Sequence, residues 1–133
     1  MEKYPKYLLE HFQNPKNVGE ILNPDGIGTT CNAACGDIMQ MFIRCDGDRI
    51  SEATFKAFGC GVAIAASSIL TQRIKGATID EAIEISERIS GEILPHLPED
   101  KTLCFKMATN ALRQAIEEHK ENHHVYPSGQ ESG

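Results

Sequence analysis

The sequence contains no run of arginine or lysine residues and no basic helix, and its formal net charge is −6 at pH 7. Nucleic acid is therefore excluded as a partner, because phosphate binding needs a basic face. No apolar stretch reaches the length of a membrane span, and residues 1–6 have neither the apolar core nor the cleavage site of a signal peptide. We therefore expect a cytoplasmic protein that binds neither nucleic acid nor a membrane.

The sequence also lacks the cysteine patterns of a disulfide framework and of a zinc knuckle. It has five cysteines, an odd number, and its nearest pair, Cys31 and Cys35, is one residue too widely spaced for a Cys-x-x-Cys knuckle. Dispersed cysteines in a chain without secretory features favour thiol or metal chemistry over disulfide bonds. The five are Cys31, Cys35, Cys45, Cys60 and Cys104.

Hydrophobic periodicity predicts the first half of the fold. Apolar residues at helical spacing predict a helix over residues 4–13, and the glycines, prolines and asparagines of residues 13–32 predict a long loop. Alternating apolar residues over 39–45 and 50–58, separated by an Asp-Gly-Asp turn, predict a β-hairpin. Cys45 has the same parity as the apolar residues of its strand, which predicts a structural place in the core.

Three helices are predicted in the second half. An apolar run over residues 62–74, closed by a glycine, predicts a buried helix. Thr78 begins a capping box, and the helix that follows it is expected to end at Ser90-Gly91. A last helix follows the Pro-containing loop 94–98 and is expected to leave a polar, mobile tail from about residue 121.

Strands followed by helices indicate an α+β fold. We expect a single domain, residues 1–133, in which a small antiparallel β-sheet is covered on one face by helices.

Three cysteines stand at the ends of predicted elements. Cys35 precedes a strand, Cys60 lies between two glycines at a helix entrance, and Cys104 is expected at the start of the last helix. Helix N-termini favour thiolates, and element ends on one side of a layered fold can converge. Asp37 is close enough in sequence to Cys35 to join them. The alternative for a cysteine at a helix start, such as Cys60, is a small buried apolar side chain.

Three thiolates and one carboxylate would complete a four-coordinate site. Such a donor set suits an iron-sulfur cluster or zinc, since both accept thiolates in tetrahedral geometry. A carboxylate oxygen holds iron in a cluster less firmly than a thiolate does, which favours a site that releases what it binds.

Four segments of the chain share a pattern with one known family. They are residues 11–19 (HFQNPKNVG), 34–39 (ACGDIM), 55–68 with FGCG at their centre, and 97–111. In this order and spacing they resemble the NifU/IscU-type iron-sulfur cluster assembly scaffolds, over about residues 4–120. The resemblance implies a stand-alone scaffold, not an enzyme, that receives sulfur from a cysteine desulfurase, assembles a cluster with iron and passes it to acceptor apoproteins.

The resemblance also implies the ligands. The family's cluster-binding positions correspond to Cys35, Asp37, Cys60 and Cys104. The [2Fe-2S] form is favoured over [4Fe-4S], zinc is an alternative occupant of the same site, and a second chain sharing the cluster would give a bridged homodimer. Two rival functions are a structural zinc module and a zinc-dependent hydrolase or deaminase, although the deaminase signature is absent.

The chain departs from the family pattern at three places. Leu103 stands where the family usually has a histidine, which leaves the fourth ligand open, and His96 is expected to be an exposed loop residue. Residues 97–101 (LPEDK) replace an apolar, proline-rich segment with charge, so service by a dedicated Hsp70 chaperone is doubtful. Cys31 stands where small residues are usual; it is either a spare sulfur acceptor or an incidental loop thiol.

Overall fold

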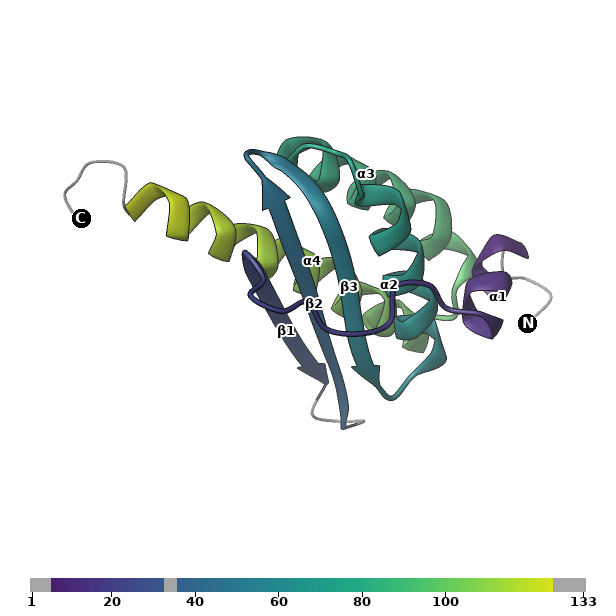
Figure 1. The fold of residues 1–133 in the computed structure, drawn as a ribbon. Coiled ribbons are helices and arrows are strands. Elements are labelled where there is room, and N and C mark those ends of the chain that lie inside the picture. Colours follow the sequence, from purple (N-terminus) through teal and green to yellow (C-terminus); the bar gives the residue numbers. More distant parts are fainter. Residues whose placement is uncertain (1–5, 33–35, 126–133) are drawn as a thin grey trace.

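Three antiparallel strands form a sheet in the order β1-β2-β3, and helices pack against it (Figure 1). The structure is a computed structural model that describes residues 6–32 and 36–125. The elements are α1 (Lys6–Gln13), β1 (Gly26–Asn32), β2 (Asp37–Asp46), β3 (Arg49–Phe58), α2 (Gly61–Ile74), α3 (Ile79–Ile93), a 3-10 turn η1 (Leu94–His96) and α4 (Glu99–Val125). The predicted α+β fold is confirmed.

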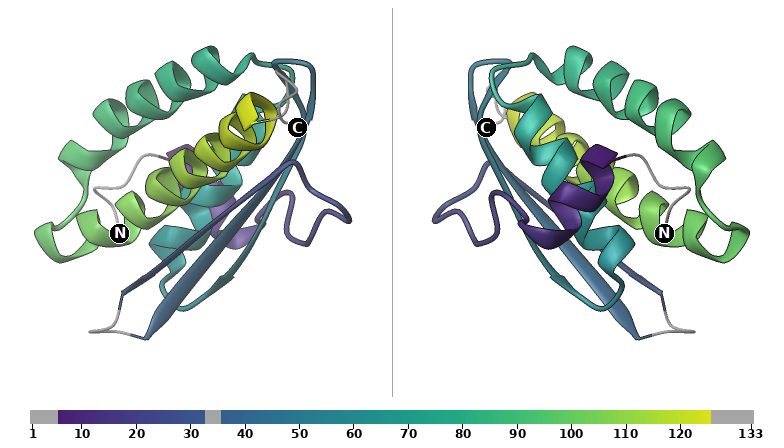
Figure 2. Two further views of the ribbon diagram at one scale, coloured as in Figure 1. Left: turned by 90° about the vertical axis from the view of Figure 1, so that its left-hand side faces the viewer. Right: turned by 90° about the vertical axis from the view of Figure 1, so that its right-hand side faces the viewer.

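The helices lie on one side of the sheet, and the segment that joins α1 to β1 crosses the other side (Figure 2). Met39, Met41 and Ile43 of β2 point to the helical side and are fully buried. On the other side Phe42 is also buried, and so is Ile21 of the crossing segment. The sheet is therefore helix-covered on one face, as predicted, and partly covered by a loop on the other.

The strand β1 was not predicted, since residues 13–32 were expected to form a loop. Its two glycines and its final asparagine are depleted in strands, and they mask the strand preference of Ile27 and the threonines between them. The glycines are required by α4: a Cβ at Gly28 would collide with the carbonyl oxygen of Ala111, and one at Gly26 with that of Ala115. The N–H groups of the outer edge also bond to α4, where Ile27 donates to Glu118 and Thr29 donates to Gln114.

The hairpin of β2 and β3 is confirmed, with a bulge between Arg44 and Cys45. The bulge interrupts the alternation of β2, so Cys45 is half-buried and packs against the edge of the core. Burial, and then the charges of Asp25 and Asp48, raise the pKa of the Cys45 thiol to about 11. Cys45 is therefore a neutral thiol at pH 7, as its predicted structural place requires.

The predicted helix signals of α2 and α3 are largely confirmed. Gly76, which follows α2, has φ of 86°, and Thr78 forms the complete capping box with Glu81. The predicted end of α3 at Ser90-Gly91 is wrong, because the helix continues to Ile93. Ile93 is fully buried, so its burial outweighs the weak helix propensity of a single glycine.

Both predicted ends of the last helix are wrong. α4 begins at Glu99, directly after Pro98, and its first turn carries the acidic Glu99 and Asp100. It continues to Val125, beyond the expected start of the tail at residue 121. No glycine or proline occurs between residues 99 and 125, so nothing in the chain stops helix propagation there.

Helix α1 is tied to α2 through one buried hydroxyl. Ser68 Oγ lies 2.6 Å from His11 Nδ1 and accepts a hydrogen bond of 2.7 Å from the backbone N–H of Lys16. Burial, and then the positive charges of Arg73 and Lys16, lower the pKa of His11, which favours the neutral imidazole. These bonds fix the end of α1 against the middle of α2.

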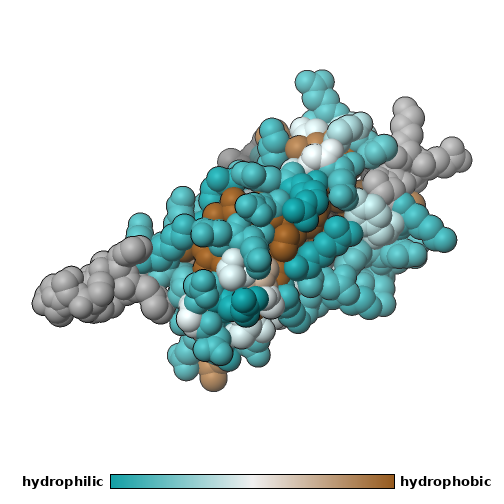
Figure 3. Space-filling view, turned by 90° about the horizontal axis from the view of Figure 1, so that it is seen from above, coloured by the Kyte–Doolittle hydropathy of each residue, from teal (hydrophilic) through white to brown (hydrophobic). Residues whose placement is uncertain are grey.

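Seen from above, the molecular surface is mostly hydrophilic, with apolar side chains showing between the polar ones (Figure 3). Within the part of the chain that the structure describes, no helix is both long and apolar enough to cross a membrane.

We predict that Gly28→Ala destabilises the protein by about 2–3 kcal/mol, because the new Cβ pushes on a helix backbone that has no room to yield. Gly91→Ala is the control: it lies inside α3 with nothing within 4 Å of its Cβ position, so it should stabilise the protein by up to about 1 kcal/mol. Denaturant unfolding measures both. Equal stability of the two variants would contradict the close approach of α4 to β1.

Candidate metal centre

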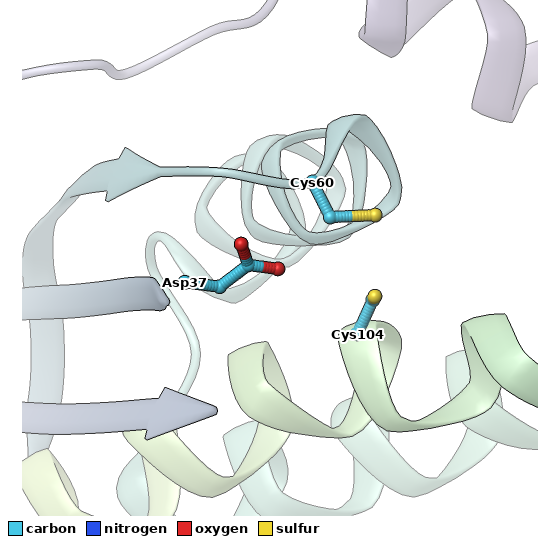
Figure 4. Close-up of side chains that lie close together, drawn as sticks. All are labelled: Asp37, Cys60 and Cys104. Atoms are coloured by element: carbon cyan, nitrogen blue, oxygen red, sulfur yellow. The ribbon is translucent and has the colours of Figure 1, made fainter. Parts of the chain in front are cut away.

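Three side chains from three elements converge at one end of the sheet. Asp37, Cys60 and Cys104 each offer a donor atom, and these atoms lie within 4.8 Å of one another. The two sulfur atoms point toward each other across the space between α2 and α4, and the Asp37 carboxylate points into the same space (Figure 4). Three of the four predicted ligands are thereby brought together.

The chain turns sharply at two of these residues. Asp37 is the first residue of β2 and follows Gly36, whose φ is 75°. Cys60 is the N-cap of α2 and has an extended backbone, which confirms its predicted place at a helix entrance. Asp37 is buried, whereas Cys60 is half-buried. The site is therefore reached from the side of Cys60.

The prediction for Cys104 is partly wrong. Because α4 begins at Glu99, Cys104 lies in its second turn and not at its N-terminus. Burial, then a hydrogen bond with Cys60 and the charge of Cys60, raise the pKa of the Cys104 thiol to about 12, although the charge of Lys101 acts in the opposite direction. The expected thiolate at a helix entrance is therefore a protonated thiol at neutral pH, and a metal ion must displace its proton on binding.

The other predicted residues lie as follows. Cys35 falls outside the described residues, so its place in the site stays a prediction; Gly36 and Asp37, which follow it, are described. Cys31 is exposed at the end of β1 and does not belong to the group. Leu103 is also exposed, and His96 is exposed within η1, where we expected an exposed loop residue.

The two glycines that flank Cys60 each lie against a particular side chain. A Cβ at Gly59 would collide with the Asp37 carboxylate, and one at Gly61 would collide with the ring of Phe12. The sequence predicts a helix over residues 4–13 but indicates neither the contact of Phe12 with Gly61 nor that of Asp37 with Gly59. The only sequence signal for either contact is the glycine itself.

A cavity of about 170 Å³ lies beside Cys60, between α1, α2 and the start of α4. Its walls are mainly apolar, apart from the Cys60 thiol and the Lys101 side chain. It is lined by Leu8, Leu9, Phe12, Cys60, Gly61, Val62, Ala65 and Lys101.

The donor chemistry limits what the group can bind. Two sulfurs and a carboxylate oxygen at this spacing suit zinc or the iron of an iron-sulfur cluster, and suit magnesium or calcium poorly because those ions take oxygen ligands. A thiol from Cys35 would complete four donors.

The sequence matches a family model. The model described as the NifU-like N terminal domain covers residues 3–125 of this chain. The iron-sulfur cluster assembly scaffold protein IscU 1 of Archaeoglobus fulgidus is 45% identical over 113 residues, which are 85% of this chain and 74% of that protein. The scaffold protein IscU of Aquifex aeolicus is 39% identical over 119 residues, covering 88% of this chain and 76% of that protein. The nitrogen fixation protein NifU of Azotobacter chroococcum is 40% identical over 118 residues, but the match covers only 38% of that protein.

Solved structures show the same fold. The N-terminal part of a NifU-like protein from Brucella abortus superposes with a TM-score of 0.73 at 18% identity, over 88% of this chain and 94% of that one. The protein FiSufU from Fervidobacterium islandicum superposes with a TM-score of 0.72 at 21% identity, over 86% of this chain and 97% of that one.

We predict that Cys60→Ser and Cys104→Ser each weaken Co²⁺ or Zn²⁺ binding by at least about tenfold, because each removes a sulfur donor. Cys45→Ser is the matched control and should leave the affinity within about twofold, since Cys45 packs at the edge of the core. Chelator competition on the metal-free proteins, with unfolding curves to confirm folding, provides the measurement. An intact affinity in Cys60→Ser, or a lost one in Cys45→Ser, would show that the assignment is wrong.

Proposed function

Because the chain belongs to the family of NifU-like N-terminal domains, we propose that it is a scaffold on which iron-sulfur clusters are assembled and from which they are transferred. The observation that carries the proposal is the convergence of Asp37, Cys60 and Cys104 on one space. The relatives named as iron-sulfur cluster assembly scaffold proteins support it. The cluster is cargo, and no small-molecule substrate is turned over.

The mixed donor set fits a cargo that must leave. Cys60 and Cys104 provide sulfur donors that bind iron firmly, whereas the Asp37 oxygen is the weaker donor. Cys35 is proposed as the fourth ligand from the family resemblance and from its place next to Gly36 and Asp37. A site built only to hold structural zinc would gain more from a fourth thiolate than from a carboxylate.

The half-burial of the site suits exchange with other proteins. Cys60 is half-buried and opens toward a cavity, whereas Asp37 and Cys104 are 7% and 4% exposed. We propose that sulfur reaches this side from a cysteine desulfurase and that acceptor apoproteins take the cluster from it. A [2Fe-2S] cluster, held within one chain or bridging two, is the proposed cargo, and zinc is the alternative occupant. The proposed location is the cytosol.

The first residues of α4 bear on whether a dedicated Hsp70 chaperone serves this protein. Pro98, Glu99 and Asp100 are exposed, and the two acids lie in the first helical turn, where they face the favourable end of the helix dipole. This acidic helix start stands where part of the family carries an apolar segment. We therefore propose that the protein works without the dedicated Hsp70.

Anaerobic reconstitution tests the function. The metal-free protein is incubated with ferrous iron, cysteine, a cysteine desulfurase and a dithiol, which supplies the electrons that reduce persulfide sulfur to sulfide. Visible absorption is followed before and after addition of an acceptor apoprotein. A scaffold becomes coloured through sulfur-to-iron charge transfer and then loses its colour to the acceptor. Cys31→Ser is the control, since Cys31 lies outside the group of donors and the variant should behave as the unmodified protein does. A protein that binds zinc but stays colourless would be a zinc module.

We predict that Asp37→Ala prolongs the life of the cluster in air and slows its transfer. The change removes the weakest donor and one negative charge beside the thiolates, and a repulsion lowered by about 1 kcal/mol corresponds to about a fivefold longer lifetime. Absorbance decay and the rate of acceptor loading measure the two effects. Faster decay in Asp37→Ala than in the unmodified protein would contradict this role of the carboxylate.

A further inference from the structure

The side chain of Asp37 occupies the place where any residue other than glycine would put its Cβ at position 59. A Cβ built on Gly59 collides with Oδ1 and Cγ of Asp37 and lies 2.9 Å from the Asp37 Cβ. No other heavy atom is among its three nearest neighbours, so the contact is between this one backbone position and this one carboxylate.

The sheet explains the contact. Ile38 of β2 pairs with Phe58 of β3, so Asp37 and Gly59 follow as the next opposed residues of the antiparallel pair. Opposed residues place their Cβ atoms close together on the same face of a sheet. Asp37 points to the helical side of the sheet, where it is buried. Gly59 has no side chain on that side, and the Asp37 side chain fills the space.

Rotation of the carboxylate cannot relieve the collision. The 2.9 Å contact reaches the Asp37 Cβ, which does not move when the side chain rotates. A side chain at position 59 would therefore displace the whole of Asp37 relative to the sulfurs of Cys60 and Cys104. The case of Gly61 is different, because it faces the tip of the Phe12 ring, and Phe12 is 46% exposed and can turn toward solvent.

We propose that Gly59 is a positioning residue: its missing side chain sets where the Asp37 carboxylate lies relative to Cys60 and Cys104, and thereby sets how firmly the site holds its metal. The inference deepens the proposed scaffold function and rests on it for cluster lability, but the effect on metal binding is independent of it. From the sequence alone, the glycines beside Cys60 are expected to allow a tight turn and the close approach of a ligand, but nothing in the sequence links Gly59 to Asp37.

The test compares Gly59→Ala, Asp37→Ala and the double variant with the unmodified protein. The control is Gly19→Ala. Gly59 has φ of 135° and Gly19 has φ of 143°, so alanine is equally strained at both, but nothing lies within 4 Å of the Cβ position at Gly19. The probe is Co²⁺, whose absorption spectrum reports the donor set and whose affinity is measured by chelator competition. Unfolding temperatures are recorded for all five proteins.

We expect Gly59→Ala to alter the Co²⁺ spectrum and weaken binding by about tenfold, the size of effect typical for residues that orient a ligand. In the Asp37→Ala background the same substitution should change the affinity by less than about twofold, because the group it displaces is gone. Gly19→Ala should keep the spectrum and affinity of the unmodified protein. After reconstitution, Gly59→Ala should also prolong the cluster lifetime, in the same direction as Asp37→Ala.

The proposal is overturned if Gly59→Ala weakens Co²⁺ binding equally in both backgrounds, or if it leaves the spectrum and affinity unchanged. Gly59→Ala could unfold too readily to be loaded with Co²⁺, and the double variant then provides the test. Because it lacks the carboxylate, the double variant must unfold at a higher temperature than Gly59→Ala. An equal or lower unfolding temperature refutes the inference. Failure of the unmodified protein to assemble a cluster would refute the scaffold function and leave the Co²⁺ comparison intact.

Discussion

The close approach of α4 to β1 determines whether a metal centre can exist at this end of the sheet. The glycines of β1 allow the strand to lie against the helix backbone, with Gly28 beneath the Ala111 carbonyl oxygen. Cys104 lies two helical turns before Ala111 on the same helix, so this contact brings its sulfur to the start of β2. A helix held farther from the sheet would leave Asp37 and Cys60 without their third partner.

The site balances retention against release. The burial that aligns Cys104 also raises the pKa of its thiol, so metal entry costs a proton and the empty site avoids an unpaired buried charge. Cys60 at the half-buried side gives access, and the Asp37 oxygen supplies a donor that iron leaves more easily than sulfur. A stable structural zinc site needs none of these compromises.

Local signals predicted the parts of the fold that local chemistry determines. The capping box at Thr78 and the glycine after α2 depend on neighbours within a few residues, and both are where the sequence placed them. Cys60 at a helix entrance is of the same kind. β1 was missed because its glycines serve a contact with a helix about 85 residues away in the chain, and no local pattern reports such a contact.

The site shows the same division. The convergence of Asp37, Cys60 and Cys104 was predictable from element ends and from the family resemblance, but the depth of Cys104 within α4 was not. Pro98 is compatible with a loop and equally with the start of a helix. The sequence therefore does not show that α4 begins directly after it, at Glu99. The fit of Asp37 against Gly59 depends on the register of β2 and β3. An alternating sequence pattern predicts on which face of the sheet a side chain lies, but not which residue of the neighbouring strand is opposite it.

Both edges of the sheet are closed by parts of the same chain. Along β1, the side chains of Glu118 and Gln114 accept hydrogen bonds from the outward N–H groups. Along β3, Phe55 exchanges backbone hydrogen bonds with Asn17 and Gly19 of the crossing segment. Unpaired edges are where one molecule adds strands to another and aggregation begins. A protein that must repeatedly empty its site and expose it to other proteins can thus do so without offering its sheet as a template for fibrous association.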